Sequence, residues 1–222
     1  MNARSTDIAA LFAVAGGVLC TPAASAQITS TFDTGDEGWG TINDTSSFGF
    51  DGTIGNPPGS IVGDDAVVGD IWYFSAPEKF LGDRSGSFGL SLSWDILGLV
   101  GDQEIDGPAD VILESGDTRI GLNLDFGPST ETFSSVSVEL DADGWEFMDT
   151  SVATGGDPVD EATFRGVLAD LDGLFIRGEY TNFADSAALD NVVLDVPAPA
   201  GAGALAAAGL VASRRRRVAR PS

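Results

Sequence analysis

The fold class is decided by the stretch SFGLSLSWDI, which occupies residues 87–96. Every second residue in it is apolar, and the residues between are serine, glycine or aspartate (apolar positions Phe88, Leu90, Leu92, Trp94, Ile96). A period of two is typical of a β-strand with one buried and one solvated face. We therefore predict a strand over these residues, with Trp94 in the hydrophobic core.

The same alternation recurs further along the chain, at 120–126 and 136–140. The segment DGTIGNPPG at 51–59 is too rich in turn-forming residues for regular structure. Shorter apolar runs that suit strands lie at 28–32, 60–62, 72–75, 111–113, 174–176 and 188–196. Many short strands joined by turns are typical of an antiparallel β-sandwich.

One helix interrupts the predicted strands. Asp157 has the chemistry of an N-cap, and Pro158 suits the first helical position. Gly173 suits the position just after a helix end. Between them, four apolar residues recur at helical spacing (Phe164, Val167, Leu168, Leu171). The predicted fold class is all-β, an antiparallel β-sandwich with one short helix.

Residues 1–26 have the three parts of a secretory signal peptide. Arg4 supplies the positive start, residues 8–19 form an apolar run, and small residues precede a cleavage site between Ala26 and Gln27 (Ala24, Ser25, Ala26). The apolar run is shorter than the ~20 residues that a membrane span needs. We expect cleavage and export, the alternative being an uncleaved N-terminal anchor.

The C-terminal segment 197–222 has a different three-part pattern. A Pro-rich motif comes first, then an apolar Ala/Gly-rich run at 200–213, then a cluster of arginines (motif Pro197, Ala198, Pro199; cluster Arg214, Arg215, Arg216, Arg217). As a helix the run would extend about 21 Å, short of the ~30 Å hydrocarbon core, although arginine side chains can narrow that gap. A membrane anchor and a flexible basic tail are both open alternatives.

The tail resembles the PEP-CTERM sorting signals of Gram-negative bacteria, in the variant that opens Val-Pro-Ala-Pro at 196–199. The resemblance implies a transient stay in the inner membrane, recognition and cleavage by an exosortase-type processing enzyme, and passage to the cell surface. The chain would then comprise a signal peptide (1–26), a folded domain (27–196) and a sorting tail (197–222).

The charge of the predicted domain limits its chemistry. Residues 27–196 hold five basic residues against 33 of the 34 acidic ones, a net charge of −28. Such a surface repels nucleic acid, so no nucleic-acid partner is expected, and it attracts divalent cations. The chain has no His, and its only Cys, Cys20, leaves with the signal peptide. Paired carboxylates would be the remaining catalytic groups, and none stands in a distinctive motif, so we predict that the protein is not an enzyme.

The motif YFSAPEKFLGDR at 73–84, followed by the strand around Trp94, resembles the core of the laminin IV (laminin B) domain. The second half agrees in order, through Gly144-Trp145, the helix around Phe164 and the stretches at 110–113, 176–180 and 189–194. The resemblance covers about residues 30–195. It implies a jelly-roll sandwich, similar to galactose-binding-like and carbohydrate-binding modules, with an architectural role in extracellular matrix and no catalysis.

Calcium is the one cofactor for which the sequence offers candidates. The stretch DQEIDG at 102–107 begins like an EF-hand loop, but its twelfth position is Leu113, where a bidentate Glu is required. Many jelly-roll modules hold a structural Ca²⁺ between their first and last strands, which places the candidate metal ligands here at Asp33 and Asp190. Backbone carbonyls near 35–38 would complete the shell. The alternative is that Asp190 hydrogen-bonds the backbone of the first strand without a metal.

Exposed aromatic rings could form a platform for sugars. Trp94, Trp39 and Trp145 are expected to be buried. Trp72 and Tyr73 are adjacent and would point to opposite faces of an extended chain, which leaves one of them a candidate for exposure, although we expect core packing for both. We predict an exported structural or adhesive domain at the cell surface or in extracellular matrix, with a polysaccharide or a surface protein as partner. A carbohydrate-binding module is the main alternative, and a hydrolase with paired carboxylates is a third.

Overall fold

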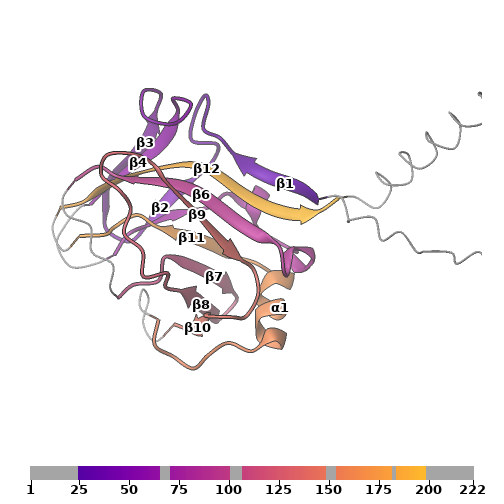
Figure 1. Ribbon diagram of the computed structural model, residues 1–222. Helices are drawn as coiled ribbons and strands as arrows, with labels where there is room; N and C mark the ends of the chain where they lie inside the picture. The colour runs from indigo at the N-terminus through magenta and orange to yellow at the C-terminus, as the bar shows by residue number, and fades with distance from the viewer. Residues whose placement is uncertain (1–24, 66–70, 101–106, 149–153, 182–183, 199–222) are drawn as a thin grey trace, which may run out of the picture.

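The computed structural model describes residues 25–65, 71–100, 107–148, 154–181 and 184–198, and these form two antiparallel β-sheets with one main hydrophobic core (Figure 1). All strand pairs in both sheets are antiparallel. Both sheets contribute apolar side chains to this core, as do the loops and the helix. The predicted β-sandwich with one short α-helix is therefore confirmed.

The first sheet has six strands in the order β3-β4-β12-β6-β9, with β1 added beside β12. Its strands are β1 (Ser25–Ser30), β3 (Thr45–Asp51), β4 (Ser60–Asp65), β6 (Ser91–Gly98), β9 (Ser134–Glu139) and β12 (Ser186–Pro197). The long strand β12 pairs with β6 along one edge, and with β4 and then β1 along the other. The first and last strands of the described chain therefore lie side by side.

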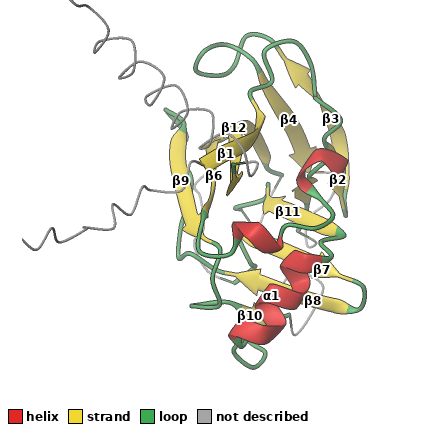
Figure 2. Ribbon diagram, turned by 90° about the vertical axis from the view of Figure 1, so that its right-hand side faces the viewer, coloured by secondary structure: helices red, strands yellow, loops and turns green. Residues whose placement is uncertain are grey.

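The second sheet has six strands in the order β10-β8-β7-β11-β5-β2. They are β2 (Gly40–Ile42), β5 (Tyr73–Ser75), β7 (Val111–Ser115), β8 (Thr118–Leu122), β10 (Glu146–Phe147) and β11 (Gly173–Arg177). Two short 3₁₀ helices, η1 (Glu78–Phe80) and η2 (Ser85–Ser87), lie between β5 and β6. The α-helix α1 (Glu161–Ala169) lies beside β7 and β8 (Figure 2).

The decisive stretch forms a strand in its second half only. Leu92, Trp94 and Ile96 alternate into the core as predicted, but β6 begins at Ser91. Upstream, Gly89 has a φ of 72°, which turns the chain out of the extended conformation. Phe88 still reaches the core region, where its ring lies 6.2 Å from that of Phe164 in α1.

The helix starts and ends at positions other than those expected. Its N-cap is Asp160, whose carboxylate accepts a hydrogen bond from the Thr163 amide at 2.7 Å, so the prediction of Asp157 was wrong. Residue 157 is instead drawn into pairing with β10, because its carbonyl accepts from the Phe147 amide. At the other end Leu171 exchanges two backbone hydrogen bonds with Gly82, which ends the helix before Gly173. The apolar stripe itself is buried as predicted (Phe164, Val167, Leu168, Leu171).

The core is built around tryptophan. The indole of Trp145 meets Phe164 edge to face with ring centroids 5.2 Å apart, which fastens α1 to the sandwich. The ring of Trp72 lies so close to Gly63 and Gly178 that a Cβ at either position would clash with it. These two glycines are therefore required by packing, at β4 and just after β11.

No helix within the described ranges combines the length and the apolar character that crossing a membrane needs. The apolar run predicted to enter the membrane, at 200–213, lies outside these ranges.

Candidate functional site

An exposed platform of Trp or Tyr rings for sugar stacking, which the sequence left open, is not present among the described residues. Trp72 and Tyr73 are both fully buried, so the expected core packing holds for both and neither is the exposed candidate. Tyr73 does point away from the main core, but there it packs with Ala109 and Ile112 and donates its hydroxyl to the Ala109 carbonyl at 3.0 Å. The other described Trp and Tyr rings are buried too (Trp39, Trp94, Trp145, Tyr180).

The outer face of the first sheet carries a shallow hollow of about 420 Å³ over β12, β6 and β9. We call it the serine hollow. Its polar lining side chains come from alternate positions on the three strands, where the neighbouring residues point into the core. The lining comprises Ser93, Trp94, Asp95, Ser135, Val136, Ser137, Asn191 and Val193.

Asp95 is the ionisable side chain of this lining, and its carboxylate is held on both oxygens. One oxygen accepts from the Ser135 hydroxyl at 2.5 Å, and the other accepts from the Asn191 side-chain amide at 2.9 Å. Asn191 reaches this position because β12 is irregular between Asp190 and Val193 and because Asn191 itself has a φ of 49°. Such a bulge directs the side chain of the extra residue where regular pairing would not.

Asp190 lies directly opposite Asp95 in the ladder between β12 and β6, and it is buried beneath the turn at 52–59. Its carboxylate accepts from the Asn56 amide at 3.1 Å and from the Asn191 amide at 2.7 Å. Burial raises its pKa, and the nearby carboxylates of Asp95 and Asp33 raise it further. Asp190 therefore fastens the turn at 52–59 to the last strand, whereas the predicted metal-free alternative had it bonded to the first strand.

Asp33 lies close enough to Asp190 to act on its pKa, and its carboxylate accepts from the Thr31 hydroxyl at 2.9 Å. No third acidic side chain of the described residues joins this pair in a group with metal-ligand spacing. These two carboxylates alone would supply only part of a Ca²⁺ shell, and the calcium site at Asp33 and Asp190 stays a prediction. Most of the EF-hand-like stretch lies outside the described residues.

A second acidic group was missed by sequence reasoning. Ligand oxygens of Asp44, Asp65 and Glu179 all lie within 4.8 Å of one another, although the three residues are far apart in the chain. Burial raises the pKa of Glu179 to about 8, with further contributions from Asp65 and Asp44, against a hydrogen bond from the Trp72 amide. Carboxylates this close can share a proton or bind a divalent cation. No spacing in the sequence could have shown it, because β4 and the end of β11 bring the residues together.

A buried pair of opposite charges also connects the start of β7 to the end of β11. Arg177 and Asp110 are 2% and 0% exposed, and their closest charged atoms are 3.9 Å apart. The Arg177 guanidinium lies over the Tyr180 ring, 4.4 Å from its centroid, and donates to the Glu179 carbonyl.

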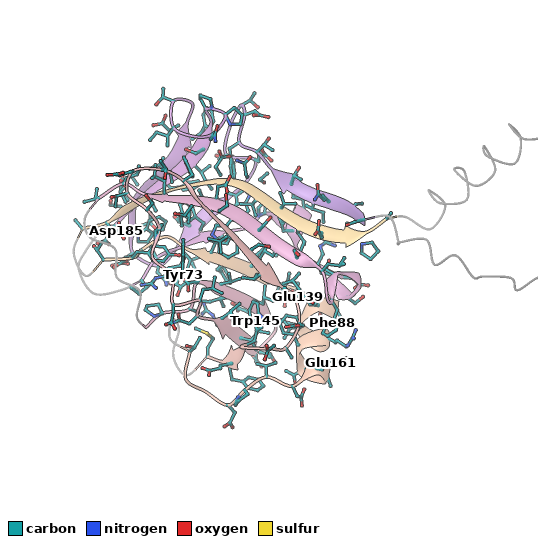
Figure 3. All side chains as sticks on the ribbon, in the orientation of Figure 1. Tyr73, Phe88, Glu139, Trp145, Glu161 and Asp185 are labelled. Atoms are coloured by element: carbon teal, nitrogen blue, oxygen red, sulfur yellow. The ribbon has the colours of Figure 1, made fainter. Side chains whose placement is uncertain are left out.

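The Asp185 carboxylate accepts hydrogen bonds from three backbone amides and so fixes the chain where β12 begins. Figure 3 shows Asp185 at one end of the sandwich and Glu161 of α1 at the other.

The two predicted processing sites meet in the fold. Ala26 pairs with Val196 and Ser25 with Pro197, so the expected signal cleavage point lies beside the start of the sorting motif. Gln27 donates its side-chain amide to Asp195 at 3.0 Å. A peptidase needs an extended, unpaired substrate, so cleavage at this point would have to precede pairing of β1. The remaining predicted processing residues lie outside the described ranges (Ala24, Pro199, Arg214, Arg215, Arg216, Arg217).

The sequence is similar to proteins of animal extracellular matrix. Laminin subunit gamma-1 of Danio rerio is 32% identical over 174 residues, which are 76% of this chain and 10% of that protein. Basement membrane proteoglycan of Caenorhabditis elegans is 29% identical over 139 residues, 63% of this chain and 4% of that protein. The chain thus spans a small part of either relative.

Solved structures show the same fold. The L4b domain of human laminin alpha-2 matches with a TM-score of 0.59 at 15% identity, over 78% of this chain and 98% of that one. The family 11 carbohydrate-binding module of a cellulosomal cellulase of Clostridium thermocellum matches with a TM-score of 0.52 at 15% identity, over 79% and 96%. Both likenesses concern the fold alone, and they agree with the predicted sandwich.

The family model described as Laminin B (Domain IV) matches residues 73–211, beginning at the YFSAPEKFLGDR motif from which the resemblance was inferred. The chain belongs to the Laminin B (Domain IV) family.

Proposed function

We propose that the chain is an exported, non-catalytic domain with a structural or adhesive role outside the cell. The observation that carries this proposal is the family match from residue 73 to residue 211, because the relatives named above are laminin and basement membrane proteins. The absence of His from the whole chain, and of Cys from residues 27–222, adds support, since it removes imidazole bases and thiolate nucleophiles.

The proposal includes a route to the surface. The signal at 1–26 directs export, the tail at 197–222 holds the protein transiently in the inner membrane, and an exosortase-type enzyme releases it to the cell surface. In the pairing of β1 with the end of β12, Ser25 lies beside Pro197, so the two processing sites of this route are neighbours at one end of the domain.

Cell fractionation tests the route. In a host that carries an exosortase, the full chain is expected at the surface without its first 26 residues and without its tail, as read by mass spectrometry. A variant with Pro197→Ala and Pro199→Ala is expected to keep the tail and to stay in the inner-membrane fraction. Recovery of the intact chain from the cytosol, with residues 1–26 still attached, would contradict the proposal.

A carbohydrate-binding role is the second candidate, with an extracellular polysaccharide as partner. One observation favours it: the serine hollow presents several hydrogen-bonding side chains on an exposed sheet face. The carbohydrate-binding module of similar fold adds only an analogy. A surface protein is the other partner class, and a pull-down with the full chain from surface extract distinguishes the two.

A further inference from the structure

The pairing of β9, β6 and β12 arranges the side chains of the serine hollow in regular rows. Ser137 of β9, Ser93 of β6 and Val193 of β12 stand in one row across the sheet, because Ser93 pairs with both of the others. Ser135 and Asp95 stand in the next row. Side chains that are directly opposite in an antiparallel pair have Cβ atoms about 5 Å apart. The three strands therefore hold their hydroxyl and carboxylate groups at fixed spacings on a rigid sheet.

The polar side chains of the hollow differ in how many hydrogen bonds they already make within the protein. The Asp95 carboxylate is oriented by Ser135 and Asn191, which leaves further lone pairs open toward solvent. Within the described residues, the hydroxyls of Ser93 and Ser137 have no hydrogen-bond partner and are free to donate or accept. The hollow thus offers two adjacent hydroxyls, one fixed acceptor and, at Val193, a small apolar surface.

Charge narrows the class of ligand. A polyanion is disfavoured, because the hollow has no cationic side chain and the predicted domain carries a net charge of −28. A cationic peptide would find one carboxylate here, already hydrogen-bonded twice, which is a poor match for several positive charges. Neutral groups that both donate and accept hydrogen bonds fit this set of side chains best.

We propose that the serine hollow binds a neutral polysaccharide, through hydrogen bonds from sugar hydroxyls to Ser93, Ser137 and Asp95. This inference rests on the proposed adhesive function and names its ligand class. Adjacent hydroxyls of one sugar unit can bridge the two serines, while the C–H face of the ring contacts Val193. Because the described tryptophans are buried, binding proceeds without ring stacking and is weak at a single site.

Affinity electrophoresis of the full chain in mild detergent tests the proposal. Mixed-linkage β-glucan and galactomannan are cast into native gels as neutral probes, and alginate serves as the anionic comparison. The wild-type chain is expected to be retarded by at least one neutral polymer and not by alginate. The double variant Ser93→Val with Ser137→Val keeps strand propensity and removes both hydroxyls, and its affinity is expected to fall roughly tenfold.

The matched control is Thr29→Val, which removes a hydroxyl from exposed strand β1, in the same row but outside the hollow. It should bind as the wild type does, and all variants should melt within a few degrees of one another. Failure of both neutral polymers to retard the wild type would overturn the proposal. Equal retardation of the double variant would overturn the assignment to the hollow, while leaving the export and adhesive role to be judged by fractionation.

Discussion

At the residue scale, the last strand shows why an Asp-Asn pair stands at 190–191. Asp190 and Asp95 lie directly opposite each other, an arrangement of like charges that destabilises a sheet. Asn191 donates its backbone amide to one carboxylate and its side-chain amide to the other. It can do so because it adopts a positive φ, which asparagine tolerates better than most residues. The resemblance located this pair, but its geometry depends on a bulge that no sequence period shows.

Two substitutions of Asn191 distinguish the contribution of its side-chain amide to stability from the contribution of its backbone conformation. Asn191→Gly keeps the positive φ and removes the donor to Asp95, and we expect it to lower the free energy of unfolding by about 1–3 kcal/mol. Asn191→Val also forces a β-branched residue into the left-handed region, and we expect a further loss of about 1–2 kcal/mol. Urea unfolding measures both. Equal losses for the two variants would show that the backbone conformation contributes nothing.

Glu179 gives the stability a dependence on pH. Its pKa is about 8 in the folded state against 4.5 for the ordinary group, so between these values the folded chain binds more protons than the unfolded chain. The free energy of unfolding should therefore fall as pH rises through this window. Glu179→Gln stays neutral at every pH, so near pH 4.5 its free energy of unfolding should equal that of the wild type. At pH values above 8, the variant should be more stable than the wild type by an amount on the order of a few kcal/mol.

Denaturation at several pH values checks this expectation. Asp110, Asp185 and Asp190 also have raised pKa values and give the wild type a slope of the same sign. The difference between the wild type and Glu179→Gln isolates Glu179 from these groups. A difference that does not vary with pH would show that Glu179 is ionised throughout.

At the scale of the elements, alternation and periodicity predicted the buried residues well. They were less successful in predicting the residues at which strands and helices begin. The inward residues of β6 and the stripe of α1 were identified because apolar burial depends on spacing, which the sequence displays. The start of α1 was misplaced because Asp157 and Asp160 both have N-cap chemistry. Pairing of residues 157–159 with β10 decided between them, and that is a tertiary contact.

The two aspartates provide a matched test of the helix start. Asp160→Ala removes the hydrogen bond to the Thr163 amide and should lower the free energy of unfolding by about 1 kcal/mol. Asp157→Ala removes a carboxylate without a capping role and should change stability by less than about 0.5 kcal/mol. Thermal or urea melts of both variants measure the difference. A larger loss for Asp157→Ala would place the cap at the position expected from the sequence.

At the scale of the whole molecule, the net charge of −28 on residues 27–196 was evident from the sequence, but its distribution over sites was not. Numerous acidic residues permit many pairs on paper, and only the fold selects those that meet. It brought Asp190 opposite Asp95, and it gathered Asp44 and Asp65 around Glu179. The serine hollow was missed for the same reason, because short polar residues on the solvent side of strands are common. Strand register, rather than composition, determines which of them stand together.

Calcium binding at Asp33 and Asp190 can be separated from general screening of this charge. Added NaCl should raise the melting temperature of the full chain, because it shortens the Debye length to about 8 Å at 0.15 M and weakens self-repulsion. At that fixed ionic strength, EDTA should lower the melting temperature if Ca²⁺ links the first and last strands. Asp33→Asn should abolish the difference between EDTA and Ca²⁺. Asp117→Asn, an exposed residue in the turn between β7 and β8 and outside the predicted calcium shell, should preserve it. An identical melt in EDTA and in Ca²⁺ would leave Asp190 with the role that its hydrogen bonds already describe, which is to hold the turn at 52–59 against β12.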